Sequence, residues 1–158
     1  MEITIQDLMD HCGVKFGTSG ARGLAEDMTD FVCYAYTCGF LQYLKAVGNI
    51  KPGKTEVAIA GDLRPSTDRI MQAVRRAAEH MGYSALNCGK IPSPAVTLYG
   101  IVHQIPAIMV TGSHIPADRN GIKFNQCFGE ILKQDEVGIR GQSITIDEAL
   151  FGDTMQFS

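Results

Sequence analysis

The pattern of apolar positions divides the chain into helix-like and strand-like segments. Residues 29–47 are apolar nearly all round at helical spacing, which predicts a long buried helix. A second amphipathic stretch begins at Ser66 or Thr67, either of which can cap a helix, and runs to Met81. Three short apolar runs have the length and composition of buried strands; they span residues 56–60, 84–88 and 106–110.

Weaker patterns fill the rest of the chain. Short apolar repeats predict a helical turn within residues 1–13 and a helix over residues 95–102. Residues 124–132 have the pattern of a strand and a turn that can pair antiparallel. The polar, glycine-containing residues 133–142 predict a surface loop, and residues 144–151 a short terminal element.

This order of helices and strands is typical of an α/β layered domain. We expect a three-layer α/β/α sandwich around a mixed, mostly parallel sheet of about four strands, with right-handed crossovers and loops gathered at one sheet edge. A chain of 158 residues can bury a sizeable core but is too short for two ordinary domains. Residues 1–158 are therefore expected to form a single domain.

Composition excludes several classes of function. The chain is 45% hydrophobic and 20% charged, as is ordinary for a globular protein. Its net charge of -3, from 14 basic and 17 acidic residues, gives no electrostatic footprint of a nucleic-acid binder and favours small-molecule partners. No apolar run approaches the length of a membrane span, and the first residues lack the pattern of a signal peptide, so we expect a cytoplasmic protein without membrane contacts.

The cysteines and histidines form no recognisable metal motif. The five cysteines are odd in number and include no Cys-x-x-Cys pair, which disfavours both a disulfide framework and a zinc site. We interpret them as reduced, mostly buried thiols. The four histidines are too scattered along the chain to suggest a metal cluster.

The stretch with the most chemistry is Thr111–Lys123, which follows the predicted strand at 106–110. Ser113 offers a hydroxyl, His114 offers an imidazole, and Pro116 limits how the turn can move. The strand is expected to deliver this serine loop to an edge of the sheet.

The end of the same loop brings a cation to the serine. Asn120 and Gly121 form a dipeptide typical of a tight turn, which is expected to bring the chain back and place Lys123 near Ser113. A hydroxyl, an imidazole and a cation on one constrained loop suit phosphoryl transfer, where positioning and charge neutralisation do most of the catalysis. The same residue types also occur in ordinary surface loops, so residue types and spacing leave both interpretations open.

A glycine-rich stretch, residues 14–23, is expected to interrupt regular structure and to leave backbone N–H groups free for a ligand. Thr18, Ser19 and Arg22 supply further donors within it. The stretch matches neither the dinucleotide-binding fingerprint nor a P-loop, and a glycine-rich turn alone is a weak signal.

Residues 48–55 do match the Gly-x-x-x-x-Gly-Lys-Thr pattern of a nucleotide-binding P-loop. A true P-loop follows a strand and opens a helix, so that its amides and the helix dipole meet the phosphates. Here a predicted helix precedes the pattern and a predicted strand follows it, and Pro52 removes one of the required N–H groups. Nucleotide binding at this place is disfavoured.

Four motifs taken together resemble the first domain of the α-D-phosphohexomutases, a family that comprises phosphoglucomutase, phosphomannomutase and phosphoglucosamine mutase. The motifs follow one another in the family's order and span essentially the whole chain; they are Phe16–Gly23, Gly61–Ser66, Gly89–Pro94 and Thr111–Lys123. The serine loop also occurs in the strand-to-loop context that such a motif requires, which favours the functional interpretation.

The resemblance implies that Ser113 carries a phosphoryl group and passes it to a hexose phosphate, with a hexose bisphosphate as intermediate. It also implies a magnesium ion bound through this phosphoryl group, with Lys123 and Arg22 spreading the charge during transfer. His114 would assist proton movement or orient the loop, and Lys123 or Arg22 are alternatives as the proton shuttle. The residues assigned to substrate binding are Thr18, Ser19, Arg22 and Lys123.

The chain departs from the family pattern in sequence and in length. Ile115 stands where the family usually has asparagine, and Gly112 where it usually has alanine, which affects the rigidity and hydrogen bonding expected of the loop. Family enzymes have four domains, and the aspartate-rich magnesium loop of the second, the sugar-selecting loop of the third and the phosphate-binding loop of the fourth are absent here. The remaining magnesium ligands are therefore expected from the missing second domain.

We interpret the chain as the first domain alone of a phosphohexomutase, expected to be inactive by itself. Its expected partners are hexose phosphates and the remaining domains, and the surface left exposed without those domains is expected to promote self-association. The alternative is a stand-alone binding or regulatory domain that keeps the loop without turnover.

Overall fold

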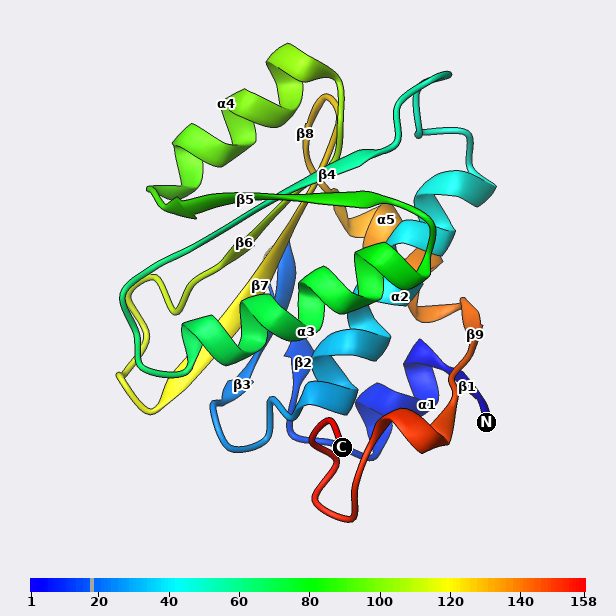
Figure 1. Cartoon of the computed structure of the whole chain (residues 1–158), viewed down its shortest axis with the longest axis vertical. Helices are drawn as coiled ribbons and strands as arrows, with labels where there is room; N and C mark the ends of the chain where they lie inside the picture. Colours follow the sequence, from blue (N-terminus) through cyan, green and yellow to red (C-terminus); the bar gives the residue numbers. More distant parts are fainter. Residues whose placement is uncertain (18) are drawn as a thin grey trace.

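The computed structural model describes residues 1–17 and 19–158, and its main element is a sheet of seven strands. The strand order is β2-β3-β7-β6-β4-β5, with β8 paired to β7 (Figure 1). The strands are β2 (Lys15–Phe16), β3 (Gly20–Leu24), β4 (Glu56–Gly61), β5 (Ser84–Lys90), β6 (Ala107–Val110), β7 (Arg119–Gln126) and β8 (Gly129–Glu130).

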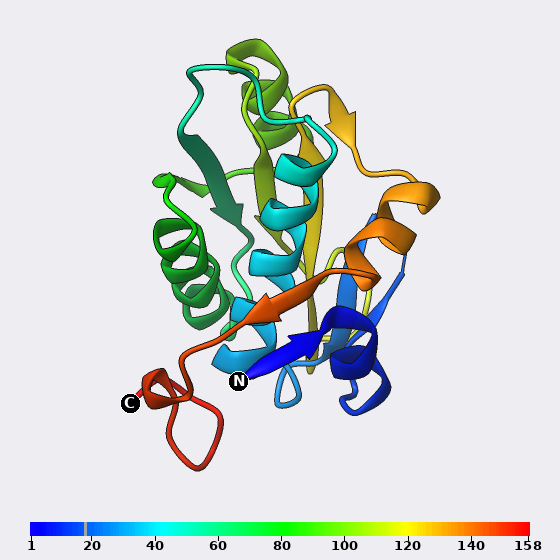
Figure 2. The same ribbon diagram turned by 90° about the vertical axis from the view of Figure 1, so that its right-hand side faces the viewer.

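Helices cover both faces of this sheet, so the expected α/β layers are present. One helix, α4, lies alone on one face, and α2 and α3 pack side by side on the other (Figure 1). A two-stranded antiparallel sheet of β1 and β9 lies with α1 and α5 beside these layers (Figure 2). The bounds are α1 (Ile5–Asp10), α2 (Asp30–Ala46), α3 (Thr67–His80), α4 (Ser93–His103), α5 (Lys133–Arg140), β1 (Glu2–Thr4), β9 (Ser143–Thr145) and the short 3-10 helix η1 (Glu148–Leu150).

The large core lies between the sheet and the α2–α3 layer. Nearly the whole of α2 is buried, as its all-round apolar pattern predicts. Phe40 of α2 stacks on Phe124 of β7 with ring centroids 4.6 Å apart. All five cysteines are free, and Cys33, Cys38 and Cys127 are buried, which confirms the prediction of reduced, mostly buried thiols.

The expectation of about four mostly parallel strands is wrong. Only the pairs β4–β5 and β4–β6 are parallel, whereas β2–β3, β3–β7, β6–β7 and β7–β8 are antiparallel. The extra strands come largely from the glycine-rich stretch, which forms the β2–β3 hairpin instead of interrupting regular structure. A Cβ on Gly20 would collide with the backbone of Ile122, and one on Gly23 would press on Gly13. Glycine here allows close backbone approach and does not end a strand.

The prediction of a surface loop at residues 133–142 is also wrong, because α5 lies there. The carboxylate of Asp135 accepts hydrogen bonds from the N–H of Leu132 at 2.7 Å, the Tyr43 hydroxyl at 2.7 Å and the Gln126 amide at 2.9 Å. Ile139 is fully buried against the core. Contacts with residues distant in sequence thus stabilise a helix that its own polar sequence does not indicate.

Residues 48–55 connect α2 to β4, so the P-loop-like pattern lies between a helix and a strand as its context predicted. That order is opposite to the one that places phosphates at a helix N-terminus. None of the helices in the described part of the chain is long and apolar enough to cross a membrane.

Candidate active site

The serine loop is shorter than expected, because residues 119–123 belong to β7. Residues 111–118, called the serine loop from here on, connect β6 to β7 at the edge of the sheet where the parallel strands β4 and β6 both end. Ser113 is exposed and has a backbone φ of 53°, a left-handed conformation that is uncommon for serine. Its N–H donates to the hydroxyl of Thr111 at 3.0 Å. The loop therefore presents the Ser113 side chain to solvent on a bent, hydrogen-bonded backbone.

Asp62, directly after β4, anchors the start of this loop. Its Oδ2 accepts hydrogen bonds from the hydroxyl of Thr111 and the N–H of Gly112, both at 3.0 Å. Its Oδ1 accepts from the N–H of Arg64 at 3.0 Å and from the Thr67 hydroxyl at 2.5 Å. One carboxylate thus joins the serine loop to the loop before α3.

These hydrogen bonds determine the ionisation of Asp62. Burial alone would raise the pKa of the carboxyl group, but its hydrogen bonds, first that of the Thr67 hydroxyl, outweigh burial and lower the pKa below its ordinary value of 3.8. A lowered folded-state pKa contributes stability that is present above pH 3.8 and is lost as the pH falls through the folded-state value.

We therefore expect the Asp62→Asn variant to be destabilised by about 1 to 3 kcal/mol near pH 6, because an amide cannot accept the same donors equally well. The difference from the wild type should shrink below about pH 4, where the wild-type carboxyl group also takes up its proton. Urea unfolding at several pH values measures this. Asp118→Asn, on the same loop but exposed, is the matched control; a pH-independent difference for Asp62→Asn would contradict the assignment.

The Arg64 side chain holds the rest of the serine loop through hydrogen bonds to its backbone. Its Nη1 donates to the carbonyl oxygens of Pro116 at 2.6 Å and Arg119 at 2.9 Å. Its Nη2 donates to those of Ile115 at 2.6 Å and Ser113 at 3.3 Å. Three carbonyl groups of the serine loop and that of Arg119, the first residue of β7, therefore converge on a single guanidinium group, whose planar set of donors suits such an arrangement.

This arrangement bears on Gly112 and Ile115, the two positions at which the chain departs from the family pattern. A Cβ on Gly112 would overlap the guanidinium group of Arg64, so the absence of a side chain makes room for it. Ile115 is held through its backbone, since its N–H donates to the carbonyl of Gly112 at 3.0 Å and its carbonyl accepts from Arg64. The loop is fastened without a side-chain amide at position 115.

The two predicted cations, Arg22 and Lys123, lie on the neighbouring strands β3 and β7. Arg22 of β3 is the Cα partner of Gly121 in β7, whose carbonyl accepts the N–H of Thr111 at 3.0 Å. A Cβ on Gly121 would touch both the Arg22 side chain and the Thr111 carbonyl. Because side chains of paired residues share a face, Arg22 and Lys123 project from the same face of the sheet, the one that α4 covers in part.

Gly121 therefore lies inside β7, and the expected tight turn at Asn120 and Gly121 is wrong. The Asn120 side chain is fully buried and donates to the hydroxyls of Ser66 at 2.8 Å and Thr67 at 3.1 Å. Ser66 directly precedes α3, but its side chain accepts no hydrogen bond from the start of that helix, so it does not act as a side-chain cap. These contacts hold β7 against the start of α3, so the chain turns back earlier, within the serine loop.

Lys123 forms an ion pair with Glu130 at 3.5 Å. The second oxygen of Glu130 accepts a hydrogen bond from the Ser19 hydroxyl at 3.0 Å, and the Ser19 N–H donates to Glu136 at 3.3 Å. Ser19, with φ of 63°, is buried in this cluster. A cavity of about 530 Å³ lies alongside and is lined by Ser19, Glu130, Glu136 and neighbouring residues. The fourth predicted substrate-binding residue, Thr18, lies outside the described residues.

The predicted site residues are thus brought to one region, but not into direct contact. Between Ser113 and Arg22, Lys123 or the exposed His114, the described residues show no hydrogen bond or ion pair. The sequence alone did not indicate Asp62, Arg64 or Glu130 as site residues. Asp62 and Arg64 lie in Gly61–Ser66, one of the four motifs that resemble the family, whereas no sequence signal marks Glu130.

Comparison with known proteins shows the family to which the chain belongs. The family model described as "Phosphoglucomutase/phosphomannomutase, alpha/beta/alpha domain I" matches residues 13–149. The chain belongs to this family. The phosphomannomutase of Salmonella muenchen is 45% identical over 133 residues, covering 84% of this chain and 27% of that protein. The phosphoglucosamine mutase of Thermotoga maritima is 36% identical over 109 residues, covering 68% of this chain and 24% of that protein.

Solved structures show the same fold. A putative phosphomannomutase from Thermus thermophilus matches with a TM-score of 0.70 and 24% identity, over 81% of this chain and 29% of that one. A phosphoglucomutase/phosphomannomutase family protein from Burkholderia thailandensis matches with a TM-score of 0.65 and 23% identity, over 77% of this chain and 28% of that one. The chain spans about a quarter of the length of these relatives.

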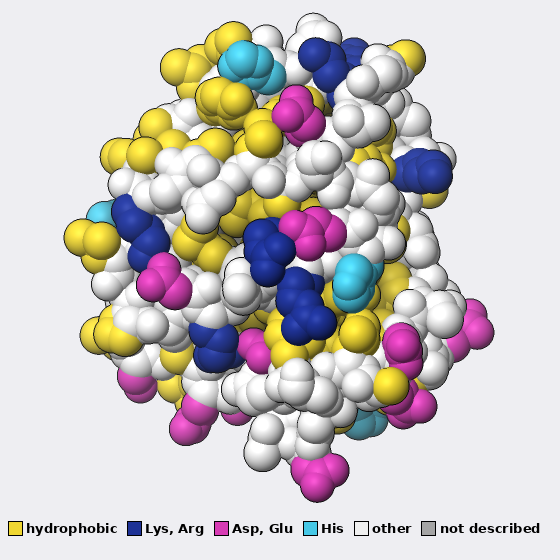
Figure 3. All heavy atoms as spheres, in the orientation of Figure 1, with side chains coloured by type: hydrophobic (Ala, Val, Ile, Leu, Met, Phe, Trp, Pro, Cys, Tyr) yellow, Lys and Arg dark blue, Asp and Glu magenta, His cyan; other side chains and the backbone are white. Residues whose placement is uncertain are grey.

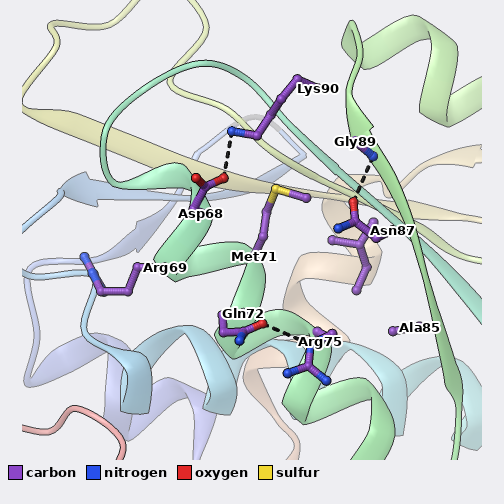
Figure 4. A pocket seen from close by; sticks show the side chains of 10 residues that line it. Asp68, Arg69, Met71, Gln72, Arg75, Ala85, Asn87, Gly89 and Lys90 are labelled. Carbon is purple, nitrogen blue, oxygen red and sulfur yellow. Dashed lines mark hydrogen bonds and ion pairs between the residues drawn. The ribbon is translucent and has the colours of Figure 1, made fainter.

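Two further cavities open near the ends of β4 and β5. One of about 360 Å³ adjoins the serine loop and is lined by Asp62, Thr111, Lys90 and Ser93, among others. The other, of about 470 Å³, lies between α3 and β5 (Figure 4). Its three basic side chains already have partners: Lys90 pairs with Asp68 at 2.8 Å, Arg69 pairs with Asp30 at 3.5 Å, and Arg75 bonds to Gln72 at 3.0 Å. Of these two cavities, the one of about 360 Å³ adjoins the serine loop.

The described residues do not by themselves form a magnesium site. No group of three or more His, Cys, Asp or Glu side chains among them is arranged to hold a metal ion. Asp62, the carboxylate at the serine loop, already accepts four hydrogen bonds. An ion at this loop would therefore need ligands other than the described side chains.

Proposed function

We propose that Ser113 carries a phosphoryl group and exchanges it with hexose phosphates, so that the protein containing this domain interconverts hexose 1-phosphate and hexose 6-phosphate through a bisphosphate intermediate. The observation that supports this most directly is the exposed Ser113 hydroxyl on a loop held by Asp62 and Arg64. Phosphoryl transfer depends mainly on such positioning and on charge neutralisation.

The transfer breaks the bond between phosphorus and the Ser113 Oγ as a bond forms to the attacking sugar hydroxyl, which gives up its proton while the leaving Ser113 Oγ takes one up. Arg22 and Lys123, on the face of the sheet beside the loop, are proposed to balance the negative charge that spreads over the phosphoryl oxygens. His114 is proposed to take up the proton or to orient the loop. The proposed substrate contacts come from Ser19, Arg22 and Lys123, together with Thr18.

The relatives indicate which sugar to test first. The phosphomannomutases are 44–45% identical to this chain, and the phosphoglucosamine mutases 33–37%. Mannose phosphates are therefore the proposed substrates. A magnesium ion, bound through phosphorylated Ser113 with its other ligands from a further domain, would neutralise charge when present. Because this domain represents about a quarter of its relatives, the remaining domains are its proposed partners.

A chimera tests the proposed function. The chain would replace the matching segment of the Salmonella muenchen phosphomannomutase, and conversion of mannose 1-phosphate would be assayed. We expect turnover, phosphate on Ser113 by mass spectrometry, and a loss of about 1,000-fold or more in kcat for Ser113→Ala.

The matched control is Ser84→Ala, which changes an exposed serine at the start of β5, the end of that strand away from the serine loop, and should retain activity. Thermal melting separates loss of folding from loss of chemistry. A folded chimera with phosphate on another serine, or with activity that survives Ser113→Ala, would refute the assignment.

A further inference from the structure

Glu130 is a carboxylate beside Lys123 to which the proposed function gives no role. Its Oε1 lies 3.5 Å from the Lys123 Nζ, and in the described part of the chain it is the only side chain that pairs with this ammonium group. The sheet neighbours of Lys123 are Gly20 on β3 and Met109 on β6, neither of which has a side chain that can accept its protons. Among the described residues, the position of the ammonium group therefore depends on Glu130.

The β7–β8 hairpin places Glu130 on the same face of the sheet as Lys123. Glu130 is the Cα partner of Asn125, which follows Lys123 by two positions, so the three side chains share one face. It is the face that α4 covers in part, since the Thr97 hydroxyl of α4 bonds to Asn125 at 3.3 Å. The serine loop lies at the other end of β7, before Gly121. Glu130 thus lies beyond Lys123 as seen from the serine loop.

The carboxylate of Glu130 is itself anchored, although its side chain is 51% exposed. Its Oε2 accepts a hydrogen bond from the Ser19 hydroxyl at 3.0 Å. Ser19 is buried, its N–H donates to Glu136 at 3.3 Å, and its carbonyl accepts the N–H of Phe124 at 3.0 Å. One oxygen of Glu130 is therefore fixed by a buried hydroxyl group, which leaves the other oxygen for Lys123.

An ordinary surface ion pair of this molecule looks different. Basic and acidic side chains gather near the middle of the face shown in Figure 3, where α3 runs in Figure 1. On α3, Arg75 and Glu79 pair at 2.8 Å one helical turn apart, with more than a third of each side chain exposed. The pair of Lys123 and Glu130 joins two strands instead, and only 25% of the Lys123 side chain is exposed. Because a pair with an exposed member stabilises a fold little, the anchoring of Glu130 points to control of the cation.

We propose that Glu130 is a positioning residue for phosphoryl transfer, which holds the Lys123 ammonium group ready for the charge that develops on the phosphoryl oxygens. This inference rests on the proposed function. A charge already in place costs no reorganisation during the reaction, whereas an unpaired lysine side chain is flexible. At 3.5 Å the carboxylate attracts the ammonium group without a short hydrogen bond, so the N–H donors can still meet a phosphoryl oxygen.

The place of Glu130 also keeps its own negative charge away from the reaction. Successive residues of a strand rise about 3.3 Å each, so Asn125 and its partner Glu130 lie about 13 Å along β7 from Gly121. A carboxylate between Lys123 and Ser113 would repel a phosphoryl group, whereas one beyond Lys123 lies on the far side of the cation. Glu130 can therefore hold the cation without opposing the phosphoryl group that the cation is proposed to meet.

The chimera with the Salmonella muenchen phosphomannomutase tests this role through kcat and KM for mannose 1-phosphate. We expect Glu130→Gln to lower kcat by about 10-fold or more and to change KM by less than about 3-fold, because the lost positioning acts mainly in the transition state. The matched control is Glu56→Gln, since Glu56 is exposed at the start of β4, the end away from the serine loop, and should leave both constants unchanged. Thermal melting checks that both variants are folded.

A double-variant cycle separates positioning from a general structural role. If Glu130 acts through Lys123, Glu130→Gln should lower kcat no further in a Lys123→Met background, whereas a loosened β7–β8 hairpin would lower it in both backgrounds. A measurement on residues 1–158 needs no turnover: the side-chain NMR signal of Lys123 should shift in Glu130→Gln and stay in place in Glu56→Gln.

Three results would overturn the role of Glu130: equal kcat for Glu130→Gln and Glu56→Gln, an additive loss with Lys123→Met, or an unmoved Lys123 signal. If one of these occurs while Ser113→Ala still abolishes turnover, the proposed function stands and only this inference fails. Activity that survives Ser113→Ala refutes the proposed function, and this inference with it.

Discussion

Purified residues 1–158 are expected to give no measurable interconversion of mannose 1-phosphate and mannose 6-phosphate. The chain spans 27% of the Salmonella muenchen phosphomannomutase, and the proposed reaction must hold the sugar in two opposite orientations. Correct positioning of reacting groups lowers a barrier by about 7 to 11 kcal/mol, which corresponds to a rate factor of about 10⁵ to 10⁸. The groups that residues 1–158 place near Ser113 cannot replace positioning by the further domains proposed above.

A coupled assay with magnesium and a hexose bisphosphate measures this loss. The chimera described above serves as the positive control, because it contains the same serine loop with the remaining domains. Turnover by the isolated chain at the rate of the chimera, and abolished by Ser113→Ala, would show that the domain needs no partner for catalysis.

Replacement of Arg64 by glutamine should destabilise the chain by about 2 to 4 kcal/mol and should loosen the serine loop. The guanidinium group bonds to three loop carbonyls and to that of Arg119, and it lies 3.4 Å from the Asp62 carboxylate, with only 16% of the Arg64 side chain exposed. Removing one member of a largely desolvated network leaves its partners without hydrogen bonds. Urea unfolding measures the free energy, and hydrogen exchange at residues 113–118 reports on the loop.

Arg75→Gln is the matched control for this variant. Arg75 pairs with Glu79 on the exposed side of α3, where an ion pair contributes about 0.3 to 0.5 kcal/mol. In the chimera, Arg64→Gln should also lower kcat more than it raises KM, because the loop positions the proposed nucleophile. Equal destabilisation by the two substitutions, or unchanged exchange in the loop, would mean that Arg64 does not hold the serine loop.

The sequence alone determined the elements whose signal is local. The apolar periods of residues 29–47 and 66–81 predicted α2 and α3, and three short apolar runs predicted β4, β5 and β6. The serine loop was also placed correctly after β6, since a buried strand followed by Gly, Ser and Pro is a local pattern. These features need no partner from elsewhere in the chain to be recognised.

Tertiary structure decided the elements that depend on distant contacts. The β2–β3 hairpin exists because glycines let β3 approach β7, which begins 95 positions after Leu24 (119 minus 24). Helix α5 is capped by Asp135, whose other partners, Tyr43 and Gln126, belong to different elements. In both cases the stabilising contacts join segments whose proximity does not show in local composition.

The same distinction between local sequence signals and distant contacts applies to the candidate site. Ser113, His114 and Lys123 could be proposed as site residues from the sequence because they share one short motif. Their arrangement in space could not be predicted. Arg64 reaches the serine loop across 49 positions of sequence, and Glu130 pairs with Lys123 only because β8 folds back on β7. Hydrogen bonds and ion pairs act over about 3 to 4 Å. Which residues come that close is set by strand order and register, and only the folded chain determines those.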